Sequence, residues 1–144
     1  LIEGLGIEKN VRFVNKYLAL PKLIDYLKAT DIFLLSGKGL TQITSGTLSY
    51  AMGCGKPIIC HPFIHAQEIV TANRGILVEL GNSKAYGEAL IKLLSNPNLM
   101  EEMGRNAYAY TRRMTWDSIA KEYLEFFNQI TEQQDTSPSS SLLQ

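Results

Sequence analysis

The chain has 144 residues, of which 45% are hydrophobic and 19% charged, and its 14 basic and 14 acidic side chains give no net charge. This length suits one globular domain. A nucleic-acid partner is not expected, because binding to a phosphate backbone depends on a basic surface. No apolar run has membrane-spanning length, and the two cysteines, Cys54 and Cys60, are too few for a disulfide framework.

The first third of the chain alternates short apolar runs with a helical pattern. It opens at Leu1 on what resembles a helix end and a turn, so we expect it to be part of a longer polypeptide. Residues 11–14 predict a short strand. Apolar residues at i, i+3, i+4 and i+7 predict a helix that Pro21 can open. Residues 31–35 then form an apolar run typical of a strand covered on both faces.

The stretch from residue 34 to residue 60 is the most informative one. It predicts a strand, a Gly/Ser/Thr-rich loop, a helix over 44–52, a stop at Gly53 and Gly55, and a second strand over 57–60. That order places a helix N-terminus at the carboxyl edge of a parallel sheet, where N–H groups and the helix dipole favour phosphates. The glycine spacing matches neither a P-loop nor a dinucleotide fingerprint.

Two histidines follow the second of these strands. Pro62 interrupts a helix between His61 and His65, so the pair does not predict a zinc site. We expect His61 to end the strand in a turn. His65 starts a predicted helix over 65–73, where it has either a local structural role or a contact with a phosphate or sugar. Glu68, one turn later, either complements the helix dipole or holds sugar hydroxyls.

The remainder of the chain continues the alternation. It predicts a strand over 75–80, a helix capped by Asn82 or Ser83, a helix to about residue 114 capped by Asn96, and a last helix capped by Thr115 with an apolar stripe. We expect a domain over residues 1–130 and a disordered tail over 131–144. Strands alternating with helices predict an α/β, Rossmann-like parallel sheet with helices on both faces.

Four segments in order carry a family resemblance: DIFLL (31–35), AMGCGKPII (51–59), QEIV (67–70) and RGILV (74–78). They resemble the C-terminal, donor-binding half of GT-B glycosyltransferases, in particular the retaining group 1 / family 4 enzymes. The resemblance implies one half of a GT-B fold with its first strand truncated. It also implies metal-independent, retaining transfer from a UDP- or GDP-linked sugar, without a separate cofactor, to an acceptor held by an N-terminal domain of the same polypeptide.

The resemblance also implies roles for particular residues. The two glutamates that mark this family fall on Gln42 and Tyr50, so Gln42 is expected to contact the donor sugar and Tyr50 to border the ribose. The diphosphate is expected at the amides of four consecutive residues, which are Thr44, Ser45, Gly46 and Thr47. His65 and Glu68 are expected to line the sugar side. No catalytic residue and no metal ligand is assigned, because the family's Arg/Lys pair lies upstream, and we expect the 144 residues alone not to transfer sugar.

Two alternatives stay open. The first is a non-catalytic binding or assembly module with a degenerate donor site, which the changes at Gln42 and Tyr50 favour. The second is an unrelated flavodoxin-like domain, which the last helices disfavour. The two cysteines in apolar surroundings are typical of a reducing compartment, so we expect a cytoplasmic protein, with peripheral association at the inner membrane face through the absent half as a further option.

Overall fold

The computed structural model describes residues 1–37 and 39–135. The elements in chain order are α1 (Ile2–Leu5), the 3-10 helix η1 (Glu8–Asn10), α2 (Leu20–Lys28), β1 (Phe33–Leu35), α3 (Gly46–Gly53), β2 (Ile58–Cys60), α4 (Ile64–Ile69), β3 (Gly75–Leu77), α5 (Ser83–Leu94), α6 (Pro97–Thr111), the 3-10 helix η2 (Arg112–Met114) and α7 (Trp116–Asp135). Strands and helices alternate through the middle of the chain, which confirms the predicted α/β class.

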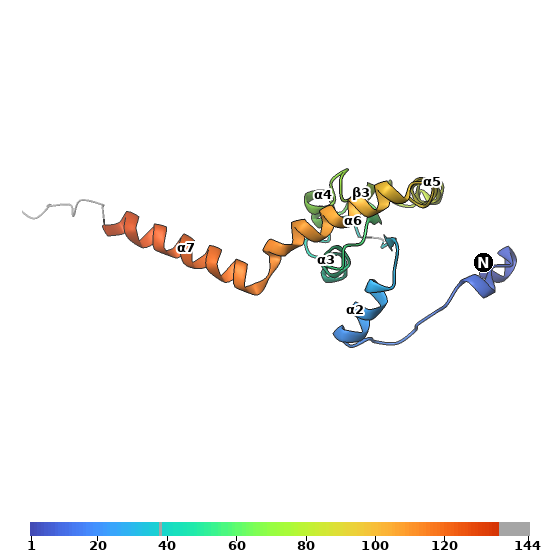
Figure 1. The fold of residues 1–144 in the computed structure, drawn as a ribbon, viewed down its shortest axis with the longest axis horizontal. Coiled ribbons are helices and arrows are strands. Elements are labelled where there is room, and N and C mark those ends of the chain that lie inside the picture. The colour runs from blue at the N-terminus through green and yellow to red at the C-terminus, as the bar shows by residue number, and fades with distance from the viewer. Residues whose placement is uncertain (38, 136–144) are drawn as a thin grey trace, which may run out of the picture.

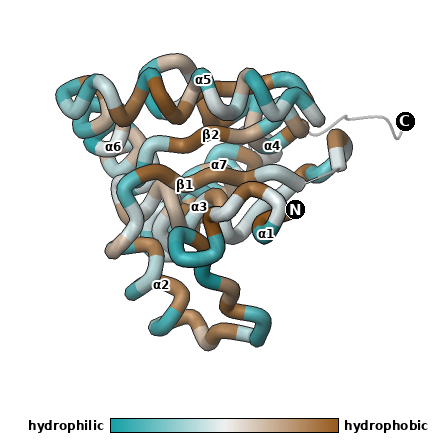
Figure 2. Tube along the Cα trace, turned by 90° about the vertical axis from the view of Figure 1, so that its right-hand side faces the viewer, coloured by the Kyte–Doolittle hydropathy of each residue, from teal (hydrophilic) through white to brown (hydrophobic). Residues whose placement is uncertain are grey.

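The three strands form one parallel sheet in the order β1–β2–β3, with Ile59 of β2 opposite Leu34 of β1 and Ile76 of β3. In Figure 2, α5 lies on one side of the strands and α3 on the other. Because the strands are parallel, their carboxyl ends share one edge of the sheet. The loops that leave this edge are therefore neighbours in space.

Buried side chains of the central strand β2 join the two layers of helices. Ile58 and Cys60 belong to a hydrophobic cluster that includes Met52 of α3. Ile59 points into a second cluster with Leu93 of α5. Alternate residues of a strand face opposite sides of the sheet, so β2 is covered on both faces. This confirms the prediction of helices on both sides.

The predicted helix starts are confirmed by their capping bonds. The side chains of Asn82, Asn96 and Thr115 each accept a hydrogen bond from the backbone N–H three residues later, at 3.0, 3.1 and 3.3 Å respectively. Pro97 is at the start of α6, where its missing N–H costs no helical bond. Each cap bonds a residue only three positions later in the sequence, so the sequence alone could predict where these helices begin.

The strand predicted over residues 11–14 is not formed. Val11 has extended backbone angles (φ −116°, ψ 128°), but the segment pairs with no strand of the described sheet. In Figure 1 this N-terminal part of the chain runs away from the sheet. An extended segment becomes a strand only when a neighbour satisfies its N–H and C=O groups, and here it has none.

Other predicted boundaries also differ. The strand expected over 75–80 is shorter and ends at Leu77. The helix expected over 65–73 is shorter, because Val70 leaves the helical region at φ −97° and ψ 86°. The last helix, α7, continues to Asp135 and projects from the rest of the fold (Figure 1). Residues 131–135, which we expected in the tail, are therefore helical, and the rest of that predicted tail lies outside the described residues. Among the helices of the described residues, none is both long and apolar enough to cross a membrane.

Candidate functional site

The candidate site is at the carboxyl edge of the sheet, where a loop that includes residues 39–45 leads into α3. Ser45 is buried and caps α3, since its Oγ accepts a hydrogen bond from the Leu48 N–H at 3.4 Å. The next two residues, Gly46 and Thr47, are exposed. Within the described part of the chain their N–H groups meet no acceptor. Free N–H groups at the positive end of a helix dipole form a site for an anion.

The side chains of two histidines attach this loop to the chain that follows β2. The Ser45 N–H donates to Nδ1 of His65 at 3.0 Å. Nε2 of His61 lies 3.1 Å from the carbonyl oxygen of Gly39. His61 directly follows β2 and is 1% exposed, which confirms the prediction that it ends the strand. The contact between His65 and Ser45 was not foreseen, because nothing local in the sequence indicates a bond across twenty residues.

Gln42 and Thr44 belong to the same loop and are both exposed. Nε2 of Gln42 donates to the carbonyl oxygen of Thr44 at 3.0 Å. This bond uses one of the two N–H donors of the amide and leaves its oxygen and its second N–H available. The structure therefore places Gln42 within the loop that precedes α3, with hydrogen-bonding capacity suited to the hydroxyls of a sugar.

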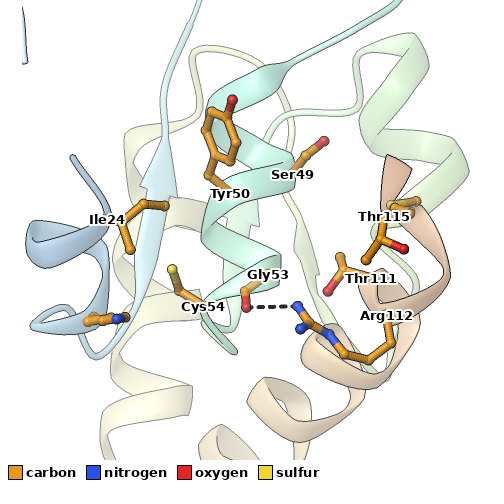
Figure 3. A pocket seen from close by; sticks show the side chains of 10 residues that line it. Ile24, Ser49, Tyr50, Gly53, Cys54, Thr111, Arg112 and Thr115 are labelled. Atoms are coloured by element: carbon orange, nitrogen blue, oxygen red, sulfur yellow. Dashed lines mark hydrogen bonds between the residues drawn. The ribbon is translucent and has the colours of Figure 1, made fainter. Parts of the chain in front are cut away.

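Tyr50 lies on the second turn of α3, and its ring points toward the start of that helix (Figure 3). A Cβ atom placed on Gly46 would lie 3.9 Å from Cε2 of the Tyr50 ring, in ordinary contact. Tyr50 also lines a cavity of about 360 Å³ between α2, α3 and η2. Tyr50 thus lies beside the first residue of α3 and also lines the cavity.

The cations around this cavity have a structural explanation. α2 ends at Lys28, α3 at Gly53 and α6 at Thr111, so the C-termini of three helices meet there. The Lys28 and Arg112 side chains complement the negative ends of those helix dipoles. Arg112 also donates from its guanidinium to the Gly53 carbonyl oxygen at 3.4 Å, the bond drawn in Figure 3. We therefore do not place the anion site in this cavity.

Glu68 occupies an exposed position on α4. It follows His65 by three residues, so the two side chains share one face of that helix. Within the described residues, no hydrogen bond or ion pair involves the Glu68 carboxylate. The structure thus gathers Gln42, the start of α3 and His65 at one loop, with Tyr50 beside them and Glu68 on the adjoining helix.

Sequence analysis missed Tyr86 as part of this edge. Its hydroxyl donates to the Leu35 carbonyl oxygen at 2.9 Å and so joins α5 to the end of β1. Burial raises the pKa of Tyr86, the neighbouring Cys60 raises it further, and a hydrogen bond from the His61 backbone opposes the shift. The only signal in the sequence was that Tyr86 shares the apolar face of its helix, which predicts burial but not the partner of the hydroxyl.

Comparisons with known proteins agree with this architecture. The family model for glycosyl transferases group 1 matches residues 1–110. An uncharacterized glycosyltransferase from Methanocaldococcus jannaschii is 31% identical over 134 residues, which are 90% of this chain and 33% of that protein. The chain thus spans about a third of the length of this relative.

Two crystal structures have the same fold. The Anabaena protein HepE, solved in complex with UDP, superposes with a TM-score of 0.77 at 22% identity over 89% of this chain and 35% of that one. The C-terminal domain of a group 1 glycosyl transferase from Francisella tularensis superposes with a TM-score of 0.66 at 20% identity, covering 85% of this chain and 58% of that one. With the family match, these likenesses show that the chain belongs to the group 1 glycosyl transferases and has the fold of the C-terminal half of a GT-B enzyme.

Proposed function

We propose that the chain binds the nucleotide-sugar donor of a retaining, metal-independent glycosyltransferase. The observation that carries this proposal is the pair of free N–H groups at Gly46 and Thr47, exposed at the carboxyl edge of the sheet. An anion bound there gains both the hydrogen bonds and the favourable end of the α3 dipole. HepE, which has the same fold, was solved in complex with UDP, and this supports a UDP- or GDP-linked donor for the present chain.

The other site residues take roles that suit their chemistry. Gln42 hydrogen-bonds hydroxyls of the donor sugar, and Glu68 accepts from the sugar hydroxyls on the side of α4. Tyr50 borders the ribose through its ring and single hydroxyl. Thr44 and Ser45 belong to the loop that leads to the phosphate amides. No cofactor other than the donor is proposed, and the reduced thiol of Cys60 suits a cytoplasmic location.

In this proposal the remaining parts of the enzyme come from an N-terminal domain of the same polypeptide. That domain holds the acceptor, supplies the cationic groups that stabilise charge on the leaving phosphate, and makes any peripheral contact with a membrane. Electrostatic stabilisation of that kind is a large part of the catalysis of such reactions. The 144 residues alone are therefore expected to bind donor without transferring sugar.

The non-catalytic alternative has less support, because the matching family and the M. jannaschii relative are both named as glycosyltransferases. The changes at Gln42 and Tyr50 are compatible with activity on physical grounds. A neutral amide still donates to and accepts from hydroxyls, and a phenol still makes one hydrogen bond. These substitutions are expected to alter which donor is preferred.

Transfer by the complete protein from a panel of nucleotide sugars tests the proposal. Gln42→Ala and Glu68→Ala each remove a hydrogen-bonding partner of the donor sugar. We expect kcat/KM to fall by roughly 2- to 10-fold in Gln42→Ala, which loses neutral hydrogen bonds, and by roughly 10- to 100-fold in Glu68→Ala, which loses a charged partner.

A matched control comes from Glu88→Ala. Glu88 is an exposed carboxylate on α5 whose side chain pairs with Lys84 at 3.8 Å, away from the proposed site. This control is expected to keep wild-type turnover. Wild-type rates in both Gln42→Ala and Glu68→Ala would refute the site assignment, and a wild-type protein that binds and uses no nucleotide sugar would refute the proposed function.

A further inference from the structure

Four hydrogen bonds join residues 39–45 of the loop to residues 61–65, which lead into α4. Two are the side-chain bonds of His61 to Gly39 and of His65 to Ser45. The other two are backbone bonds, from Ile64 N–H to the Leu40 carbonyl at 3.3 Å and from His65 N–H to the Gln42 carbonyl at 3.2 Å. The loop that leads into the anion site is thus fixed by residues outside it.

The partners of the two rings define their protonation. Nδ1 of His65 accepts the Ser45 N–H, so this imidazole is neutral at Nδ1 and carries its hydrogen on Nε2. Nε2 of His61 faces a carbonyl oxygen, so that nitrogen is the donor. The Nδ1 atom of His61 is buried and meets no partner among the described residues. The rings therefore serve the loop in opposite ways, one as a donor and one as an acceptor.

The bond to His65 falls on the residue that orients the start of α3. Besides accepting from Leu48 through Oγ, Ser45 accepts a hydrogen bond from the Ser49 hydroxyl at its carbonyl, at 3.2 Å. With both its carbonyl and its N–H engaged, the peptide units of Ser45 cannot rotate freely. The N–H groups that follow, those of Gly46 and Thr47, then keep one direction. The Ser45 N–H itself is already used and is not offered to a ligand.

We propose that His65 is a positioning residue, whose neutral imidazole holds the Ser45 N–H and thereby presents the Gly46 and Thr47 amides to the donor diphosphate. The proposal rests on the proposed function for the identity of the ligand. It changes the expected role of His65 from a contact with the donor to a support for the groups that make that contact. It also removes the Ser45 N–H from the four amides that were expected to bind the diphosphate, because His65 already accepts from it.

Two substitutions separate the hydrogen bond from the bulk of the side chain. In His65→Asn, the side-chain oxygen sits about as far from Cβ as Nδ1 does, so the acceptor is kept. In His65→Phe, a ring of similar shape remains without an acceptor. His65→Leu is a second variant without an acceptor, for the case in which the larger ring disturbs folding. Circular dichroism and the thermal midpoint establish that each variant is folded.

The first measurement is amide hydrogen exchange over residues 36–48 in the complete protein without ligand. The second is calorimetric binding of UDP and of GDP. We expect His65→Phe to speed exchange at Ser45 by about tenfold and to weaken nucleotide binding by about tenfold, the effect of losing one hydrogen bond of ordinary strength. We expect His65→Asn to stay within about threefold of wild type in both, because it keeps an acceptor for the same bond.

Each other outcome overturns a defined part of the inference. Unchanged exchange in His65→Phe and His65→Leu would show that the bond does not hold the loop. Faster exchange with undiminished binding, or an Asn variant as impaired as the Phe variant, would remove the positioning role. If wild type binds neither UDP nor GDP, the proposed function fails and the positioning role fails with it. In that case, slow exchange at Ser45 that becomes fast in His65→Phe would still establish that His65 holds the Ser45 N–H.

Discussion

The thiol of Cys60 is buried at the carboxyl edge of the sheet, and this burial changes its acidity. Cys60 ends β2 with its side chain fully buried, and this burial raises the pKa of its thiol from 9.0 to about 12. Burial disfavours the thiolate because a charge in apolar surroundings loses its hydration. The thiol is therefore expected to be inert in the folded protein, in contrast to Cys54, which is partly exposed.

The shifted pKa of Cys60 predicts a loss of stability in base. Below about pH 9 both the folded and the unfolded chain hold the proton, so this group adds no pH dependence. Between about pH 9 and about pH 12 the unfolded chain releases the proton while the folded chain keeps it. The free energy of unfolding then falls by up to about 1.4 kcal/mol per pH unit.

Urea unfolding of wild type and Cys60→Ala at about pH 8 and about pH 10.5 measures this contribution. Wild type should lose about 2 kcal/mol more than the variant over that interval. Equal losses of unfolding free energy in wild type and Cys60→Ala would contradict the raised pKa of Cys60. As an independent check, iodoacetamide should label Cys54 of the folded protein well before Cys60.

The residue scale also separates what sequence can predict from what it cannot. Asn82, Asn96 and Thr115 could be predicted as caps because capping is local, and each does accept from an N–H only three residues away. The role of His65 depends on Ser45, which is twenty residues away and reaches it only after the loop has folded. Candidate site residues could therefore be named from pattern and family resemblance, whereas their hydrogen bonds could be known only from the folded structure.

At the scale of elements, α6 approaches the turn after α3 so closely that a glycine is needed at the contact. A Cβ atom on Gly104 would collide with the Gly55 carbonyl oxygen and would lie 3.8 Å from the Pro57 ring. Gly55 has a positive φ of 71°, a conformation that glycine adopts without strain, so this turn cannot easily shift. The predicted stop of the α3 helix at Gly53 and Gly55 thus also forms a surface on which α6 packs.

Gly104→Ala is therefore expected to destabilise the protein by about 1–3 kcal/mol, as overpacking of a core does. Gly87→Ala is the matched control, because Gly87 also lies within a helix, α5, and a Cβ atom there would meet nothing within 4 Å. That variant should gain about 0.5–1 kcal/mol from the higher helix propensity of alanine. Urea unfolding of the two variants checks both signs, and equal stabilities would contradict the proposed contact.

Helices and strands were predicted well where the residues of the segment itself determine its structure. β1 and β2 were located because both runs are apolar throughout, although only β2 is buried along its whole length and Leu34 of β1 is 38% exposed. Residues 11–14 have the composition of a strand, yet composition does not provide a neighbour, and the segment remains unpaired. Phe13 accordingly stays 77% exposed. Strand formation is a property of a pair of segments, which limits any prediction made from one of them.

At the scale of the whole molecule, α7 is a 20-residue helix with few contacts to the rest of the fold. Residues 120–132 are all exposed. They carry an apolar stripe whose aromatic members are Tyr123, Phe126 and Phe127. Neighbouring rings of this stripe contact each other, with the centroids of Tyr123 and Phe127 6.0 Å apart. A patch of large apolar side chains marks a surface for another part of the protein. We therefore expect the stripe to pack against the proposed N-terminal domain.

This arrangement predicts different amide exchange in α7 for the 144-residue chain and for the complete protein. Most helical stability in proteins comes from the packing of an apolar face, and residues 120–132 of α7 are all exposed in the chain alone. Exchange over residues 120–132 should therefore be fast in the chain alone and at least about tenfold slower in the complete protein if the proposed N-terminal domain covers the stripe. Residues 97–111 of α6 pack against α3 and α5. They serve as the internal reference and should exchange at the same rate in the 144-residue chain and in the complete protein. Equal exchange of α7 in the two proteins would contradict the docking of the stripe on the N-terminal domain.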